Sequence, residues 1–258
     1  MTAVTFFDAW WVGSLGTEAL ASLALVFPFQ ALMQMMAGGA IGGGITSAVA
    51  RAKGSGNLTF AKKIAFNGLL IGMFMSLFYT IILGVFSIHI LGLLSDSKDV
   101  INGAVKYAKV GFGGAILTWL FFSLASVLRG LGDTYTPAKA IVMAGCLQII
   151  MSGLFTLGFV DFVNFGIVGP AAAMIICHAL AAFFLLSQII GPNSLLKPQN
   201  WVFDWSAIFK ILKVGGPGLL NSITIALTIV VITSFVADFG VDALAGYGLG
   251  SRLELMLV

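Results

Sequence analysis

Asp8 is the acidic residue whose position in the chain points most directly to chemistry. It lies in the apolar stretch Phe6–Val12, about 9 Å inside the end of the first predicted helix. A carboxylate held in an apolar interior is costly and is usually functional. Because such a group can take up a cation on one side and release it on the other, we predict that Asp8 couples an ion gradient to work. The alternative is an aspartate that lines a wet crevice or pairs with a lysine.

Four uncharged polar residues are further candidates. Gln148 and Ser152 are four residues apart and therefore share one face of a predicted helix. Gln34 and Asn221 also interrupt apolar runs. Each of the four can line a cavity, or it can form hydrogen bonds between helices.

The residues that usually hold metals are too scattered to form a site. The two cysteines, Cys146 and Cys177, lie in apolar runs, and His89 and His178 are far apart. Metal sites need clustered ligands. We therefore predict no metal, no cofactor and no enzymatic activity.

The composition explains which elements must position these side chains. Hydrophobic residues make up 59% of the chain and charged residues only 9%, against roughly 25% charged in a soluble domain. The net charge of +3 is too small and too scattered for nucleic-acid binding. These numbers predict an all-α, polytopic membrane protein.

Gaps between charged residues mark the predicted spans, since a bilayer span needs about 20 mostly apolar residues. A half span, residues 1–14, comes first, and a truncated one, residues 242–258, comes last. Six complete spans lie between them: 19–50, 64–95, 110–128, 140–160, 162–196 and 214–237.

The basic residues predict the orientation, because lysine and arginine prefer cytoplasmic loops. Nine of the 13 fall in three alternate loops, which would make those loops cytoplasmic. The first helix should then run from the cytoplasm outward. The opposite loops are predicted to hold Lys98, Lys106 and Lys109 beside Asp96 and Asp99.

The chain also contains an apparent internal repeat. A shift of 224 residues aligns Val12–Leu25 with Val236–Leu249, with six of fourteen positions identical. An even number of spans per repeat predicts two units of parallel orientation. Residues 1–200 would then form a first six-helix lobe with an incomplete first helix, and residues 201–258 the beginning of a second lobe.

Four motifs together resemble the multidrug and toxin compound extrusion (MATE) family. Residues 7–16 (FDAWWVGSLG) resemble its first-helix motif, and residues 128–137 (LRGLGDTYTP) resemble its loop between helices four and five. Residues 166–173 (GIVGPAAA) and 54–57 (GSGN) are similar to its sixth-helix start and to the turn after its second helix.

This resemblance implies twelve helices in two lobes and a central cavity that faces each side of the membrane in turn. It implies export of organic, often cationic compounds in exchange for protons or sodium ions. By the same resemblance, Gln148 and Ser152 occupy places where many relatives carry an asparagine and an aspartate of a cation site. Both are neutral here, which favours protons over sodium.

A lipid-linked oligosaccharide flippase of the same superfamily is the alternative function. Its cavity should be cationic, and no arginine is predicted to face the cavity within the spans. We therefore predict small organic substrates and membrane lipid as partners, no nucleic acid, a monomer, and a multi-pass location in the cell membrane, which is the inner membrane in a Gram-negative bacterium.

Overall fold

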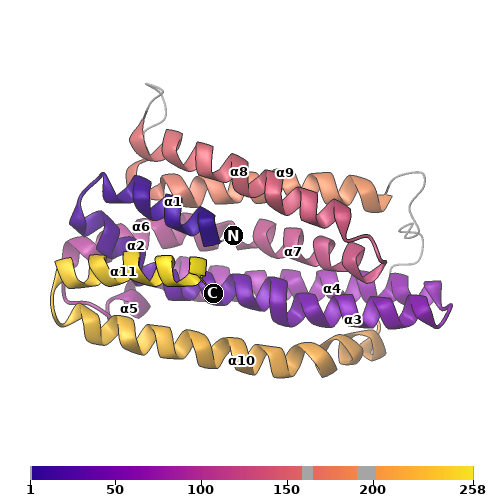
Figure 1. The fold of residues 1–258 in the computed structure, drawn as a ribbon. Helices are drawn as coiled ribbons and strands as arrows, with labels where there is room; N and C mark the ends of the chain where they lie inside the picture. Colours follow the sequence, from indigo (N-terminus) through magenta and orange to yellow (C-terminus); the bar gives the residue numbers. More distant parts are fainter. Residues whose placement is uncertain (1, 159–164, 191–201, 258) are drawn as a thin grey trace.

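The computed structural model describes residues 2–158, 165–190 and 202–257, and all regular elements in these ranges are helices that lie roughly side by side (Figure 1). Predicted positions 159–164 and 191–201, which include Lys197 and the proposed lobe boundary, lie outside the described residues. The bounds are α1 (Thr2–Gly13), α2 (Thr17–Gln34), η1 (Met35–Ala40), α3 (Ile41–Gly54), α4 (Leu58–Tyr79), η2 (Thr80–Val85), α5 (Ser87–Leu91), α6 (Lys98–Gly113), α7 (Ala115–Gly130), α8 (Tyr135–Leu157), η3 (Gly166–Val168), α9 (Gly169–Ile190), α10 (Trp205–Ala237) and α11 (Val241–Leu257).

The prediction of an all-α protein with several membrane spans is confirmed. Five continuous helical segments in the described residues are long and apolar enough to cross a bilayer, and the bent pair α6–α7 makes a sixth. The second span is a single rod, Thr17–Gly54, in which the π-helical turn η1 joins α2 to α3. Each of the six predicted complete spans therefore has a counterpart.

The fourth span corrects one prediction. Lys106 and Lys109 were expected in a loop, but they lie on α6, which begins at Lys98 and meets α7 at a bend of 47°. Both lysines are exposed, whereas Tyr107 and Ala108 are buried. The length of such a helix is underestimated when spans are predicted from the stretches between charged residues, because an amphipathic helix can carry charges on one face along its whole length.

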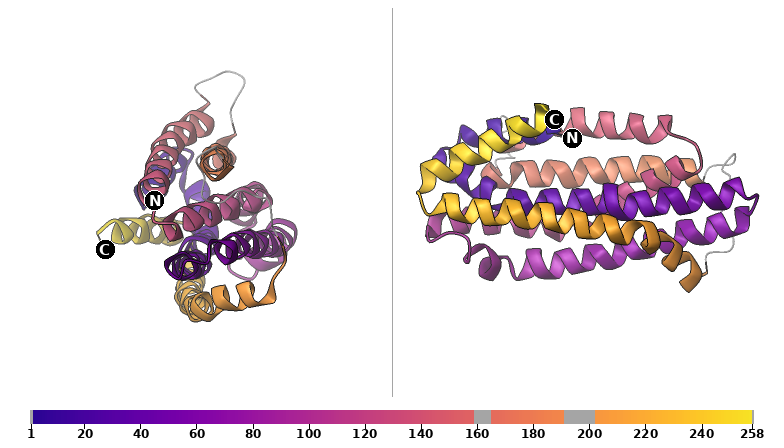
Figure 2. Two further views of the ribbon diagram at one scale, coloured as in Figure 1. Left: turned by 90° about the vertical axis from the view of Figure 1, so that its right-hand side faces the viewer. Right: turned by 60° about the horizontal axis from the view of Figure 1, so that its bottom comes forward.

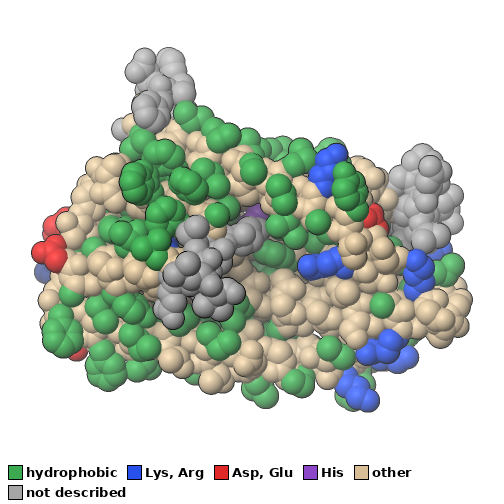
Figure 3. Space-filling model, viewed as in Figure 1, with side chains coloured by type: hydrophobic (Ala, Val, Ile, Leu, Met, Phe, Trp, Pro, Cys, Tyr) green, Lys and Arg blue, Asp and Glu red, His purple; other side chains and the backbone are tan. Residues whose placement is uncertain are grey.

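Charged side chains gather at the two ends of the molecule. Most of the lysine and arginine side chains visible in Figure 3 lie toward the right-hand end, where α3, α7 and α10 have their basic termini, with an acidic side chain among them, and most of the visible acidic side chains lie at the left-hand end beside a basic one. The basic end is the one predicted to be cytoplasmic.

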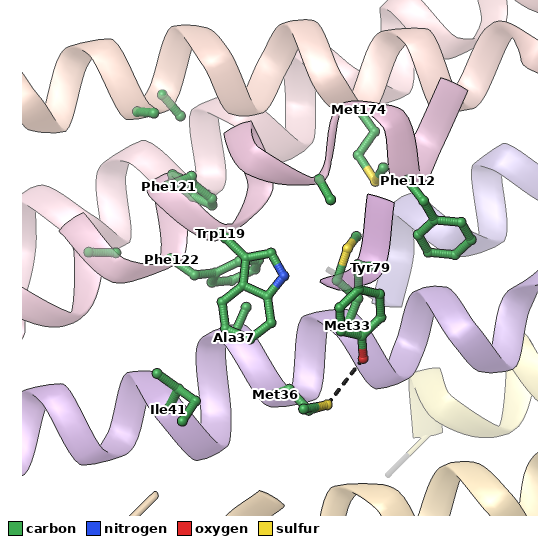
Figure 4. Packing of buried hydrophobic residues seen from close by; sticks show 14 of the residues in the cluster. Met33, Met36, Ala37, Ile41, Tyr79, Phe112, Trp119, Phe121, Phe122 and Met174 are labelled. Carbon is green, nitrogen blue, oxygen red and sulfur yellow. Dashed lines mark hydrogen bonds between the residues drawn. The ribbon is translucent and has the colours of Figure 1, made fainter. Parts of the chain in front are cut away.

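Large apolar side chains from several helices fill the centre of the bundle. Trp119 and Phe121 of α7 are fully buried, and Met33 and Met36 of the second span lie near Tyr79, beside Trp119 (Figure 4). The hydroxyl of Tyr79 donates to Sδ of Met36 at 3.1 Å (Figure 4). These two methionines therefore belong to the packed core.

The last two helices pack on the second span. α10 lies along α2 and α3, and α11 lies against α2 and α1 (Figures 1 and 2). The described part of the chain beyond residue 201 thus contacts the helices that carry the candidate residues.

Candidate functional site

One face of α8 carries polar residues toward α1. Gln148, Ser152 and Thr156 follow one another at intervals of four and are all buried. Trp11 of α1 packs closely against this face, since a Cβ on Gly153 would lie 2.9 Å from the indole ring. The indole also donates to the carbonyl of Ile149 at 3.2 Å. These contacts fix α1 against α8.

Asp8 is buried beside this polar face. Its side chain is 4% exposed, and its Oδ2 accepts a hydrogen bond from Nε2 of Gln148 at 3.3 Å. Its Oδ1 has no hydrogen-bond partner in the described residues. The Ser152 hydroxyl lies near enough to interact with the carboxylate, but it makes no hydrogen bond of good geometry there. The carboxylate thus retains an open acceptor in an apolar setting.

A second polar group continues from α2 to α6 and α9. The Tyr107 hydroxyl donates to Oε1 of Gln30 at 2.9 Å, and Nε2 of Gln30 lies 3.3 Å from Sδ of Met174. Tyr107 is also within electrostatic range of Asp8. Spacing alone did not single out Tyr107, since a tyrosine in an apolar run has no distinguishing pattern.

Arg252 is the residue that sequence reasoning missed. It is 1% exposed, and its guanidinium donates to the carbonyl oxygens of Gly248 at 2.5 Å and Leu23 at 3.4 Å. It also lies 4.6 Å from the ring centroid of Phe27. The sequence predicted only that no arginine faces the cavity within the spans, and it did not anticipate a buried arginine on α11. The available signal was a lone positive charge inside the truncated span 242–258.

Arg252 acts on Asp8 through space. The guanidinium is close enough for electrostatic attraction to the carboxylate, but the two groups form no salt bridge within 4 Å. Because both groups are buried, the interaction is screened less than it would be in water. Asp8 on α1 and Arg252 on α11 therefore form a long-range charge pair.

The other two predicted residues lie apart from Asp8. Gln34 is half-buried at the end of α2, one helical turn after Gln30. Asn221 of α10 is exposed and lines a cavity of about 340 Å³ with Gly39 and Gly43 of the second span. The structure thus groups Asp8, Gln148 and Ser152 and places Asn221 on a separate groove.

His178 lies in the core of α7 and α9. Its Nδ1 is 3.0 Å from the hydroxyl of Thr118, and its ring stacks on Phe121 with centroids 5.1 Å apart. In the described residues, no group of three His, Cys, Asp or Glu side chains could hold a metal ion.

Residues 1–154 match the MatE family. The chain belongs to this family. The match covers the helices that carry Asp8, Gln148 and Ser152.

Relatives of this MatE chain carry the names of multidrug resistance, multidrug export or transport proteins. It is 26% identical over 93% of its length to the probable multidrug resistance protein YoeA of Bacillus subtilis, and 27% identical over 97% to the FAD transporter of Shewanella oneidensis. It is 25% identical over 92% to the multidrug export protein MepA of Staphylococcus aureus. The matches cover 52%, 56% and 52% of those proteins, so the chain spans about half the length of the curated relatives that it matches.

Solved structures show the same fold. The inward-facing conformation of a multidrug resistance MATE family transporter superposes with a TM-score of 0.89 over 99% of this chain and 58% of that one, at 23% identity. A MOP superfamily transporter from Pyrococcus furiosus gives 0.84 over 98% of this chain and 56% of that one, also at 23% identity. The chain is thus a multi-pass membrane protein of the MatE fold.

Proposed function

We propose that the intact protein is a secondary active antiporter. It exports organic, often cationic compounds by alternating access, in exchange for protons or sodium ions. The names of the multidrug relatives support the substrate class, and the family match supports transport. Catalysis has no part in this proposal.

The observation that carries the proposal is the Asp8 carboxylate, which is buried and has one oxygen without a partner. A cation that binds there gains a strong electrostatic partner in a medium that screens charges weakly. When the site opens to the other side, water can replace the lost interaction and the cation leaves. Asp8 is therefore our proposed coupling residue.

Protons suit this site better than sodium. A sodium ion needs several oxygen ligands, whereas the side chains nearest Asp8 that can hold a cation are the neutral Gln148 and Ser152, and Gln148 presents its NH₂ group to the carboxylate. A proton needs only the free Oδ1. We assign Gln34 and Asn221 to the wall of the substrate pathway.

Proton binding also offers a physical link to the second lobe. The charged carboxylate is attracted to Arg252 of α11, and the protonated one is not. The two protonation states thus differ in how strongly they hold α11 near α1. Such a difference between states is what shifts a conformational equilibrium.

Ethidium uptake into everted membrane vesicles tests the proposal, because the cytoplasmic face of these vesicles is outside and export fills the lumen. The full-length protein should accumulate ethidium when the lumen is made acidic, and an imposed sodium gradient alone should give little or no accumulation. Sodium-driven accumulation would reassign the ion. Transfer of a lipid-linked oligosaccharide, without ethidium transport under either gradient, would replace the antiporter with the flippase alternative.

A further inference from the structure

A basic pocket opens at the end of the bundle where α3, α4 and α10 meet. Its volume is about 620 Å³. The side chains that give it its character are Arg51, Ser55, Asn57, Phe60, Lys210 and Lys213. Residues far apart in the sequence thus contribute to one cavity, with α3 and α4 on one wall and α10 on the other.

The charge of this pocket is not neutralised from within. No carboxylate belongs to its described lining. The nearby carboxylate of Asp204 forms its salt bridge with Lys63, at 3.2 Å, and caps α10. In the described part of the chain Lys210 and Lys213 have no salt bridge.

Helix dipoles do not cancel this charge. The carboxyl end of α3 reaches the pocket and contributes a partial charge of about −0.5, while the amino end of α4 contributes about +0.5. Three formal positive charges remain. The pocket is therefore complementary to an anion.

Two of the three cations are held in place. Nζ of Lys210 lies over the ring of Phe60, 4.3 Å from its centroid. Nη1 of Arg51 donates to Oγ of Ser47 at 2.8 Å and keeps further N–H groups free to bind a ligand. A ligand therefore meets partly ordered donors, which lowers the entropy cost of binding.

The level of the pocket along the bundle matches a membrane interface. It lies at the basic end (Figure 3). Trp205 and Phe209, near the amino end of α10, are exposed, and exposed aromatic rings are typical of the headgroup region. Basic pockets between helices at the cytoplasmic face bind anionic lipid headgroups.

The pocket also adjoins the groove that holds Asn221. Val214 lines both cavities. On the second span, Gly39 and Gly43 line the groove and Arg51 lines the pocket, so the two cavities follow one another along the same rod. A ligand in the basic pocket would therefore contact both walls of the seam between the second span and α10.

We propose that this pocket binds a phosphate group, as a phosphodiester or a diphosphate, between α3 and α10. An anionic phospholipid headgroup and a soluble phosphate compound share this chemistry. This site is separate from Asp8, and equilibrium binding to it needs no ion gradient, so the inference stands or falls independently of antiport.

Binding to the purified, delipidated full-length protein tests the inference. Native mass spectrometry would measure binding of phosphatidylglycerol and, separately, of phosphatidylcholine, and calorimetry would measure binding of inorganic pyrophosphate. The double variant Lys210→Gln/Lys213→Gln should bind the anion on the order of tenfold or more weakly, since each basic residue contributes about 1 kcal/mol. The double variant Lys210→Arg/Lys213→Arg should bind the anion as the wild type does.

The control is Lys106→Gln/Lys109→Gln, which removes the same charge from exposed positions of α6. Thermal unfolding without ligand checks that all variants are folded. Loss of phosphatidylglycerol binding only in the pocket variant assigns a lipid headgroup, and loss of pyrophosphate binding assigns a soluble phosphate. If neither anion binds, or if both double glutamine variants behave alike, the proposal is wrong.

Discussion

Gly16 and Gly240, 224 residues apart, occupy equivalent turns with the same backbone conformation. Their φ angles are 113° and 102°. The flanking hydrogen bonds also correspond. Gly16 N donates to the Gly13 carbonyl as Gly240 N donates to that of Ala237, and the Gly16 and Gly240 carbonyls accept from Leu20 N and Leu244 N. Both turns lie at the same end of the molecule (Figure 1). This agreement supports the predicted repeat at the level of its first turn.

The two glycines should be needed for their turns. An L-residue is strained at these φ values, at a cost of about 1–3 kcal/mol. We expect Gly16→Ala and Gly240→Ala each to lower the unfolding midpoint of the purified protein in a thermal melt.

Gly246→Ala is the matched control, because Gly246 is exposed in α11 and a Cβ there meets no atom within 4 Å. It should be neutral or slightly stabilising. Equal melting points for all three variants would show that the positive φ is not required.

Asp8→Asn should abolish coupled efflux and leave the protein inserted. The amide keeps the size of the side chain but cannot bind and release a proton. We expect proton-driven ethidium accumulation in everted vesicles to fall at least tenfold, with unchanged protein in the membrane fraction. Asp99→Asn, which alters an exposed acid at the start of α6, should have normal efflux. Normal drug export by the Asp8 variant would refute its assignment.

Arg252 should stabilise the packing of α11 on α2. Arg252→Met keeps an unbranched apolar stem but removes the donors to Leu23 and Gly248 and the contact with Phe27. We expect a loss of about 2 kcal/mol, the cost of leaving buried carbonyl groups with fewer donors. Differential scanning fluorimetry would measure it. Ser251→Ala serves as the neighbouring control, and an Arg252→Met protein as stable as wild type would argue against this role.

The Asp204–Lys63 ion pair should make stability depend on pH. The hydrogen bond from Lys63, helped by the backbone amides of Ser206 and Ala207, holds the pKa of Asp204 below its usual value. Because the pKa of Asp204 is lower in the folded protein than in the unfolded chain, the ionised carboxylate stabilises the folded state fully at pH values above the unfolded pKa, near 3.9. This stabilisation is lost as the pH falls through the folded pKa. Asp204→Asn should therefore melt below wild type at pH 7.

The same two proteins should converge only when melted below the depressed pKa of folded Asp204, which lies under the unfolded value of about 3.9. Asparagine caps a helix as well as aspartate does, so this variant isolates the charge, whereas Asp204→Ala should also lose the cap. A gap between Asp204→Asn and wild type that stays constant with pH would mean that the ion pair is not its source.

The sequence by itself determined the fold class and most of the span positions. Charged residues are unfavourable inside a bilayer, so each span appears in the sequence as a long apolar stretch. It failed at α6, where Lys106 and Lys109 sit on the outer face of a helix and interrupt the run without ending it. The depth of Asp8 in an apolar stretch was likewise visible, and so was the shared face of Gln148 and Ser152.

Only the tertiary structure decided which of these residues meet. Asp8 and Gln148 are 140 residues apart in the sequence, and their hydrogen bond depends on the packing of α1 against α8. The approach of Arg252 to Asp8, and the basic pocket that joins Arg51 to Lys210, depend on how α10 and α11 lie against the first helices. Local spacing carries no information about such contacts, because they are set by side-chain packing between segments that are distant in the sequence.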